Sequence, residues 1–137
     1  MVVTGGCLCR GVRYEISAAP ISSRACWCRV CQYLGAGTAT VSAAFLKSAI
    51  VIAGKVSSYR SVADSGSIMH RTFCPACGTP LFSEAESRSH LIFVRAGSLD
   101  DPELARPVAT IWAAEAPNWA CFDESIPRID GQPPPVG

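Results

Sequence analysis

The sequence predicts a small, mostly β fold. Hydrophobic residues make up 49% of the 137 residues and charged residues 17%, which is enough apolar material for a core and too little charge for disorder. The 11 glycines and 10 prolines are scattered along the chain, which indicates many turns between short elements. A chain of this length suits a single domain over residues 1–137, with a core of about 5–119.

The expected strands follow one another with short connections. The first is GVRYEIS (11–17), in which Val12, Tyr14 and Ile16 share one face. Further extended segments are expected at 36–44, 48–54, 55–62, 67–73, 80–84, 90–97 and 108–114. Turn-like residues 63–66 separate two of these segments, as they would in a hairpin.

The most apolar stretch, residues 39–54, is interrupted by Lys47 and is too short for a membrane-spanning helix. It predicts a buried pair of strands.

Helical turns are expected at two places, CRVCQYL (28–34) and DPELA (101–105). Asp101 and Pro102 suit the start of the second, as an acidic cap followed by proline. No helix longer than about three turns is expected. The proline-rich tail, 126–137, should run extended along the surface.

Charge and cysteine content narrow the class of protein. The formal charge of +1, without a Lys/Arg-rich run, argues against binding to nucleic acid. The start MVVTGGCLC lacks the basic and apolar regions of a signal peptide, so we expect a cytoplasmic protein that needs no membrane. In a reducing compartment, eight cysteines point to metal binding or thiol chemistry. Four disulfides in an exported protein are the alternative.

A zinc knuckle is predicted at CPACGTP (74–80). Cys74 and Cys77 bracket a tight turn, so both sulfurs can reach one ion. Gly78 follows, where a backbone with positive φ is often needed. One knuckle supplies two ligands, and a closed structural site needs two more.

Cys7 and Cys9, in GGCLCRG (5–11), are the natural second pair. On a strand their side chains would point to one face about 6.6 Å apart. Tetrahedral zinc needs sulfurs about 3.8 Å apart, so the chain must bend. Three glycines make bending easy: Gly5, Gly6 and Gly11. The spacing favours a four-cysteine structural zinc over disulfides or a redox-active pair.

A second group of cysteines lies in ACWCRVCQ (25–32), where Cys26, Cys28 and Cys31 fall within six positions. A structural zinc takes four protein ligands, whereas a catalytic zinc takes three and keeps a place open. The fourth ligand of this group could lie elsewhere or could be a substrate. Cys121 is the remaining cysteine, and it is either that ligand or a free or buried thiol.

The chain resembles the glutathione-dependent formaldehyde-activating enzyme family. The resemblance runs from about Gly5 to Trp119 and is carried by GGCLCRGVRYEI, CWCRVC, FCPACGTPLF, GSLDDPELARP and IWAAEAPNW. It implies the mostly β, zinc-tied fold also seen in methionine sulfoxide reductase B. It implies a structural zinc on Cys7, Cys9, Cys74 and Cys77, and a catalytic zinc on Cys26, Cys28 and Cys31. The open place on the second zinc would take a substrate thiol or water.

The chain departs from common family residues at four positions near these motifs. Trp27 stands where histidine is common, Gln32 where a basic residue is common, Arg10 where glycine is common and Thr110 where histidine is common. All the implied metal ligands are present. The four departures are therefore expected to affect the shape of the pocket and the choice of substrate rather than metal binding.

The implied reaction is that of a carbon–sulfur lyase-type enzyme. A zinc-bound thiol is deprotonated near neutral pH, so glutathione could add to formaldehyde and give S-hydroxymethylglutathione. Zinc could also polarise the carbonyl oxygen, although three thiolates weaken it as a Lewis acid. We expect two zinc ions per chain, with the second site easier to empty and partly occupied in purified protein.

Anionic glutathione would need cations near the second site, and Arg24 and Arg29 flank the motif. Both could instead be solvated surface arginines. Trp27 suits either a pocket wall or the core. His70 could act as a proton shuttle or be an ordinary strand histidine.

Other functions stay open at the level of sequence. The chain could act on another small thiol or electrophile, or serve as a non-enzymatic two-zinc binding module, as in a centromere-associated branch of the same family. A methionine sulfoxide reductase would need a dedicated redox cysteine, and Cys121 is the one spare. The particular aldehyde and the oligomeric state are not specified.

Overall fold

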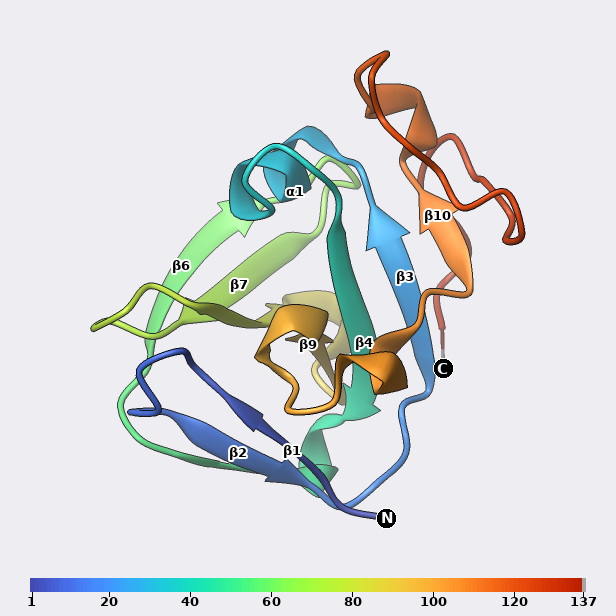
Figure 1. Cartoon of the computed structure of the whole chain (residues 1–137). Helices are drawn as coiled ribbons and strands as arrows, with labels where there is room; N and C mark the ends of the chain where they lie inside the picture. Colours follow the sequence, from blue (N-terminus) through green and yellow to red (C-terminus); the bar gives the residue numbers. More distant parts are fainter. Residues whose placement is uncertain (137) are drawn as a thin grey trace.

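A seven-stranded sheet forms the body of the protein in the computed structural model, which describes residues 1–136 (Figure 1). Its strand order is β10-β3-β4-β9-β8-β7-β6. All neighbouring pairs are antiparallel except β10 with β3. The strands are β3 (Ser22–Cys26), β4 (Thr40–Leu46), β6 (Ser57–Val62), β7 (Ile68–Phe73), β8 (Pro80–Ala85), β9 (Leu91–Arg95) and β10 (Ala109–Ile111).

A second, three-stranded antiparallel sheet has the order β1-β2-β5. Its strands are β1 (Val3–Gly6), β2 (Arg13–Ile16) and β5 (Ile50–Ala53). Residues 1–136 contain one α-helix, α1 (Arg29–Leu34). The 3₁₀ turns are η1 (Lys47–Ala49), η2 (Glu86–Arg88), η3 (Ala96–Ser98), η4 (Pro102–Ala105) and η5 (Ala113–Glu115). None of the helices described is long and apolar enough to cross a membrane.

The predicted mostly β fold with short helical turns is therefore confirmed. Every segment expected to be extended contains a strand, and the hairpin around residues 63–66 joins β6 to β7. The two helical segments also appear. Asp101 caps the second, because its side chain accepts a hydrogen bond from the amide of Glu103 at 3.1 Å.

The prediction of a buried strand pair over residues 39–54 is wrong in one half. β4 is central and buries Ala43 and Phe45, whose exposed fractions are both 0%. β5 instead leaves the larger sheet, pairs with β2 and lies at an edge, where Val51 is 72% exposed. β5 packs mainly against β2, and Ile50 alone of its residues packs against the core cluster, so Val51, Ile52 and Ala53 stay exposed.

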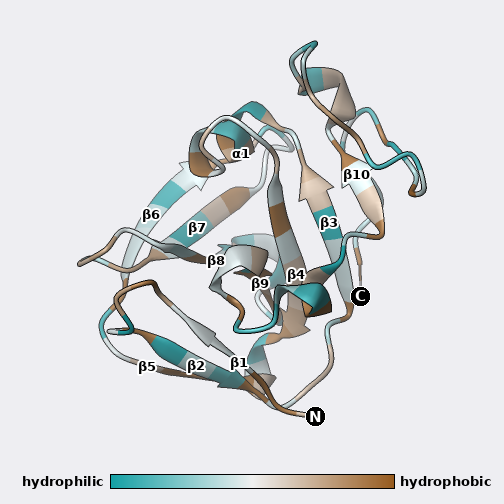
Figure 2. Cartoon of the chain, viewed as in Figure 1, coloured by the Kyte–Doolittle hydropathy of each residue, from teal (hydrophilic) through white to brown (hydrophobic). Residues whose placement is uncertain are grey.

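The two sheets meet in one hydrophobic core. Tyr14 of β2 lies edge-on against Phe82 of β8, with ring centroids 5.2 Å apart. Its hydroxyl forms a 2.7 Å hydrogen bond with Ser98, and burial raises the pKa of Tyr14 to about 12. Figure 2 shows hydrophilic and hydrophobic residues within single strands such as β7. Alternate residues of a strand face opposite sides, so the large sheet has one core face and one polar face.

The C-terminal tail runs beside β10. The amide of Thr110 donates to the carbonyl of Pro127 at 2.9 Å, and the amide of Ile129 donates back to Thr110 at 2.8 Å. The tail therefore extends the edge of the large sheet before it continues toward the polar face.

Candidate functional site

Four cysteines from two distant segments come together at one end of the core. The sulfur atoms of Cys7, Cys9, Cys74 and Cys77 all lie within 4.8 Å of one another. Cys7 and Cys9 follow β1, whereas Cys74 and Cys77 lie in the turn between β7 and β8. The Sγ–Sγ distances are 3.5 Å for Cys7–Cys9 and 3.8 Å for Cys9–Cys74. These spacings suit four thiolates around one tetrahedral ion.

Backbone amides support these sulfurs. The amide of Val12 donates to Cys7 Sγ at 3.2 Å, and the amide of Cys77 donates to Cys74 Sγ at 3.4 Å. A hydrogen bond with Thr79 lowers the pKa of Cys77 to about 5. Both effects favour the deprotonated form that binds a metal. Gly78 has φ 76°, as its place after the second cysteine predicted.

The bend between Cys7 and Cys9 does not use Gly5 or Gly6, two of the three expected glycines. Gly5 and Gly6 lie within β1, and a Cβ at Gly5 would collide with the Tyr14 hydroxyl. The turn closes instead at Arg10, whose φ is 64° and whose amide donates to the carbonyl of Cys7 at 3.0 Å. An arginine in this left-handed conformation is strained, because its Cβ crowds the backbone.

Replacing Arg10 with glycine is therefore expected to stabilise the protein by about 1 kcal/mol. The change relieves the left-handed strain at an exposed side chain that has no packing to lose. The melting temperature of the metal-loaded protein should rise by about 3 °C. Lys55→Gly, at an exposed position outside the left-handed region, is the matched control and should give no such rise. An unchanged or lower melting temperature for Arg10→Gly would contradict the prediction.

The second group of cysteines surrounds the start of α1. The sulfur atoms of Cys26, Cys28 and Cys31 lie within 4.8 Å of one another. Cys26 ends β3, and Cys28 caps the helix by accepting a hydrogen bond from the amide of Cys31 at 3.3 Å. Within the described residues, no further Cys, His, Asp or Glu joins this group. Cys121 is exposed and lies outside both groups.

The three thiols of this group divide their protons unequally. Hydrogen bonds with Cys28 and Cys31 raise the pKa of Cys26, whereas hydrogen bonds with Cys26 and Cys28 lower the pKa of Cys31 to about 2. Three thiolates at this distance repel one another. All three thiols can therefore be deprotonated together only when a cation lies between them. Three thiolates leave one position of a tetrahedral ion without a side-chain ligand.

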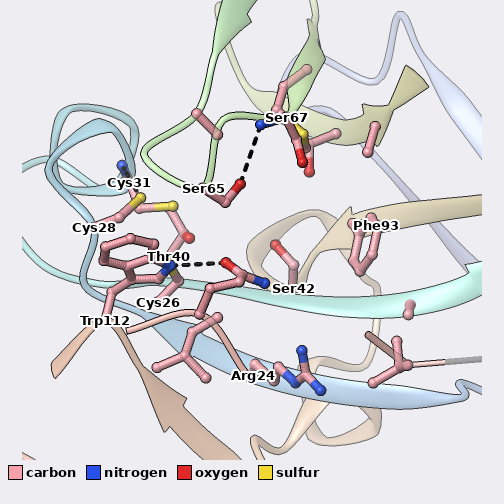
Figure 3. A pocket seen from close by; sticks show the side chains of 18 of the residues that line it. Arg24, Cys26, Cys28, Cys31, Thr40, Ser42, Ser65, Ser67, Phe93 and Trp112 are labelled. Carbon is pink, nitrogen blue, oxygen red and sulfur yellow. Dashed lines mark hydrogen bonds between the residues drawn. The ribbon is translucent and has the colours of Figure 1, made fainter. Parts of the chain in front are cut away.

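A cavity of about 420 Å³ opens beside Cys26, Cys28 and Cys31 (Figure 3). Its floor is the polar face of the large sheet. Arg24 and Cys26 are alternate residues of β3, and they pair with Ser42 and Thr40 of β4. All four line the cavity, so the register places an arginine and a thiol of the second cysteine group on the same face.

The same face continues across the neighbouring strands. Arg95 of β9 pairs with Ser42, and Arg71 of β7 pairs with Ser83 of β8. These residues also line the cavity, together with Phe93, Ala85 and Met69 from the same three strands. The floor therefore combines arginines and small polar side chains with Phe93, Ala85 and Met69, none of which belongs to the main core cluster.

Arginines dominate the charge of this cavity. Among the described residues that line it, four are arginines and one, Asp64, is acidic. The arginines are Arg24, Arg71, Arg88 and Arg95. A concave site with this balance favours an anionic ligand.

The C-terminal tail forms one wall of the cavity. Arg24 Nη2 donates to the carbonyl of Pro134 at 3.2 Å, and Arg88 donates to the carbonyl of Val136. Trp112 Nε1 donates to Gln132 Oε1 at 2.9 Å, a bond drawn in Figure 3. These contacts hold the tail across one side of the space next to the cysteines.

The other residues singled out from the sequence lie away from the cavity. Arg29 is exposed on α1 and donates to Gln32 Oε1 at 2.6 Å. Trp27 is 5% exposed and packs against Trp119 and Phe122. His70 forms a 2.6 Å hydrogen bond with Glu86 and is not among the lining residues. Of the two predicted arginines, Arg24 alone reaches the cavity.

Sequence reasoning did not identify Arg71, Arg95 or the tail as parts of this site. The available signal was the alternation of side chains between the two faces of any strand, which puts Arg71 on the face of Met69 and Arg95 on the face of Phe93. That alternation does not say which strands are neighbours, and the shared cavity depends on that order.

Comparison with known proteins places the chain in a family. The model of the family described as glutathione-dependent formaldehyde-activating enzyme matches residues 2–115. The chain belongs to this family. The match contains both groups of cysteines and ends before the tail that closes the cavity. The family name indicates an enzyme that acts on formaldehyde and glutathione.

A solved structure of a Rhodobacter sphaeroides protein shares the fold of this chain. The TM-score is 0.56 at 20% identity, over 71% of this chain and 87% of that chain. At this identity the likeness concerns the fold alone. No curated protein gives a significant match.

Proposed function

We propose that this chain is a zinc enzyme of the carbon–sulfur lyase type that interconverts glutathione plus formaldehyde with S-hydroxymethylglutathione. The observation that carries the proposal is the convergence of Cys26, Cys28 and Cys31 at the wall of an arginine-lined cavity. Three protein thiolates leave room for a fourth, exchangeable ligand at the point where the cavity begins. A related small thiol could take the same place.

The donor sets support zinc at both sites. Sulfur-only sets select soft or borderline metals, and a tetrahedral set of four thiolates is typical of zinc or an iron–sulfur centre. Cys7, Cys9, Cys74 and Cys77 would form the closed, structural site. Cys26, Cys28 and Cys31 would form the open, catalytic one.

The chemistry requires a thiolate, a carbonyl and a proton. Zinc bound in the open site would lower the pKa of a thiol that takes the fourth position, so that the thiol is a nucleophile near neutral pH. The glutathione sulfur then adds to the carbonyl carbon of formaldehyde, and a C–S bond forms. The C=O π electrons move to oxygen, which takes a proton from water. The reverse steps cleave the adduct.

The residues of the chain would bind and orient the reactants. Arg24 lies two residues from Cys26 on the same face of β3 and suits a carboxylate of glutathione. The β6–β7 turn, with Ser65 and Ser67, overhangs the opposite side of the cavity (Figure 3). Together with the tail, it would limit access of water to the reacting atoms.

The reaction can be tested by exchange spectroscopy. ¹³C NMR of labelled formaldehyde with glutathione reports the exchange between free formaldehyde and the adduct. Zinc-loaded protein should accelerate this exchange above the spontaneous rate, and protein with the Cys28→Ser change should not. Glutathione binding without acceleration would contradict the enzymatic proposal and favour a two-zinc binding module.

Deleting residues 132–137 is expected to make the second metal easier to remove. The deletion takes away the tail wall and the acceptors of Arg24 and Arg88, so a chelator can approach the open site. A colorimetric zinc indicator in excess, which itself takes up the released metal, should show a faster first phase of metal release. The slower phase, from the four-cysteine site, is the internal control and should not change. An unchanged first phase would mean that the tail does not limit access.

A further inference from the structure

Two arginines lie deep in the cavity without a carboxylate partner among the described residues. Arg71 of β7 is 8% exposed, and Arg95 of β9 is partly buried. Their hydrogen-bond partners are neutral hydroxyls: Arg71 donates to Ser61, and Arg95 Nη1 donates to Ser42 Oγ at 3.0 Å. The ion pairs of residues 1–136 involve neither of them.

Buried guanidinium groups of this kind are costly without a counter-charge. Arg71 Nε is fully buried and has no hydrogen-bond partner. Burial lowers the pKa of Arg95, as expected where solvent is excluded from a cation. A planar guanidinium with free donors matches the two oxygens of a carboxylate.

The sheet sets the distances among Arg24, Arg95 and the second cysteine group, and Arg71 lies close enough to Arg95 to interact with it electrostatically. Arg24 and Arg95 flank Ser42 on the two neighbouring strands, so their Cα atoms lie about 10 Å apart. Arg24 is two residues from Cys26, about 6.6 Å along β3. A tripeptide spans about 10 Å when extended. A tripeptide with cysteine in the middle, bound through the sulfur of that cysteine, would therefore bring its terminal carboxylates within reach of the arginines on the cavity floor.

We propose that Arg71 and Arg95 bind a carboxylate of the thiol that occupies the open metal position, so that the site selects acidic thiols over neutral ones. This inference rests on the proposed function and assigns to these two arginines the choice of thiol. Arg24, on the far side of Ser42, would face the other end of the ligand.

A different role for Arg95 is a counter-charge for the thiolates themselves, because it lies close enough to Cys31 to interact with it electrostatically. In that role, its removal would weaken metal binding. The selectivity for acidic thiols would then stay as it was.

A carboxylate could also belong to the carbonyl substrate rather than to the thiol. The experiment separates these cases.

Binding of thiols to the zinc-loaded protein can be measured by calorimetry without any carbonyl compound. Glutathione should bind about tenfold or more tightly than its diethyl ester, which keeps the thiol and loses both carboxylate charges. Arg95→Met and Arg71→Met should each weaken glutathione binding by about tenfold to hundredfold and leave ester binding within about twofold. Arg106→Met, an exposed arginine outside the cavity, is the matched control and should change neither.

Circular dichroism and zinc content accompany each variant, and Arg71→Lys serves if Arg71→Met does not fold. Lysine keeps the charge and should retain part of the preference for glutathione. Equal affinity of the wild type for glutathione and its ester would overturn the inference. A loss of the second zinc in Arg95→Met, with the preference unchanged, would also overturn it and leave the counter-charge role.

A final arm locates the carboxylate. With 2-mercaptoethanol as a neutral thiol, adduct formation is compared for formaldehyde and for glyoxylate, which carries a carboxylate of its own. A defect of Arg95→Met confined to glyoxylate would assign the arginines to the carbonyl substrate and overturn the inference. Formaldehyde exchange could fail to accelerate while the arginine substitutions still reduce the preference for glutathione over its ester. In that case the proposed reaction is wrong and the inference about the thiol stands.

Discussion

Replacing Cys74 with serine is expected to leave the protein unfolded or insoluble. Cys74 is 2% exposed within the main core cluster, and its sulfur lies 3.8 Å from that of Cys9, 65 residues earlier. A structural zinc in such a set contributes about 10–16 kcal/mol at neutral pH. A domain is stable by about 5–15 kcal/mol in total, so the loss of this site removes most or all of the stability.

Soluble yield, circular dichroism and zinc content check this prediction. Cys121→Ser is the matched control, because Cys121 is exposed and belongs to neither group. It should give a folded protein with the same zinc content as the wild type. If Cys74→Ser folds normally and binds as much zinc as the wild type, the four-cysteine site is not structural.

Replacing Cys28 with serine is expected to abolish activity while the fold persists. The change removes one of three thiolates from the open site and should lower activity by at least about 100-fold. Loss of a residue that only hydrogen-bonds to a metal ligand can already lower activity by up to about 100-fold. Serine is a good N-cap, so its hydroxyl can still accept the hydrogen bond from Cys31 that begins α1. Cys28→Ala should be less stable than Cys28→Ser by about 1 kcal/mol, because alanine loses that cap as well.

X-ray absorption of the zinc-loaded protein provides the measurement. In the wild type, glutathione should add a sulfur to the second ion, and Cys28→Ser should remove this response and lower the zinc content from two toward one. The circular dichroism of the variant should match that of the wild type. Detection of Cys121 as a ligand of the second ion, with no response to any thiol, would contradict the catalytic role and indicate two structural zincs.

Local patterns predicted the strands whose signal lies within a few residues. The turn-like residues 63–66 between the segments 55–62 and 67–73 specified the β6–β7 hairpin, because such pairing needs no distant contact. β3 was not predicted, since SSRAC has no alternation of large apolar residues. Its place beside β4 decides that it is a strand.

The sequence by itself determined which cysteines could share an ion. Cys26, Cys28 and Cys31, like Cys74 and Cys77, are close along the chain, and a short turn brings their sulfurs together whatever surrounds them. The bend at Cys9 was also required by the metal geometry, although its location at Arg10 appeared in the structure alone.

The tertiary structure alone decided what faces the second cysteine group. Arg24, Arg95 and Arg71 come from β3, β9 and β7, and the strand order brings them to one floor. That order depends on long-range pairing, such as that of Ser42 in β4 with Arg95 in β9, which alternation within one strand does not encode. The tail reaches the same cavity through contacts with β10 and two arginines, so the wall over the cysteines is also a product of the fold.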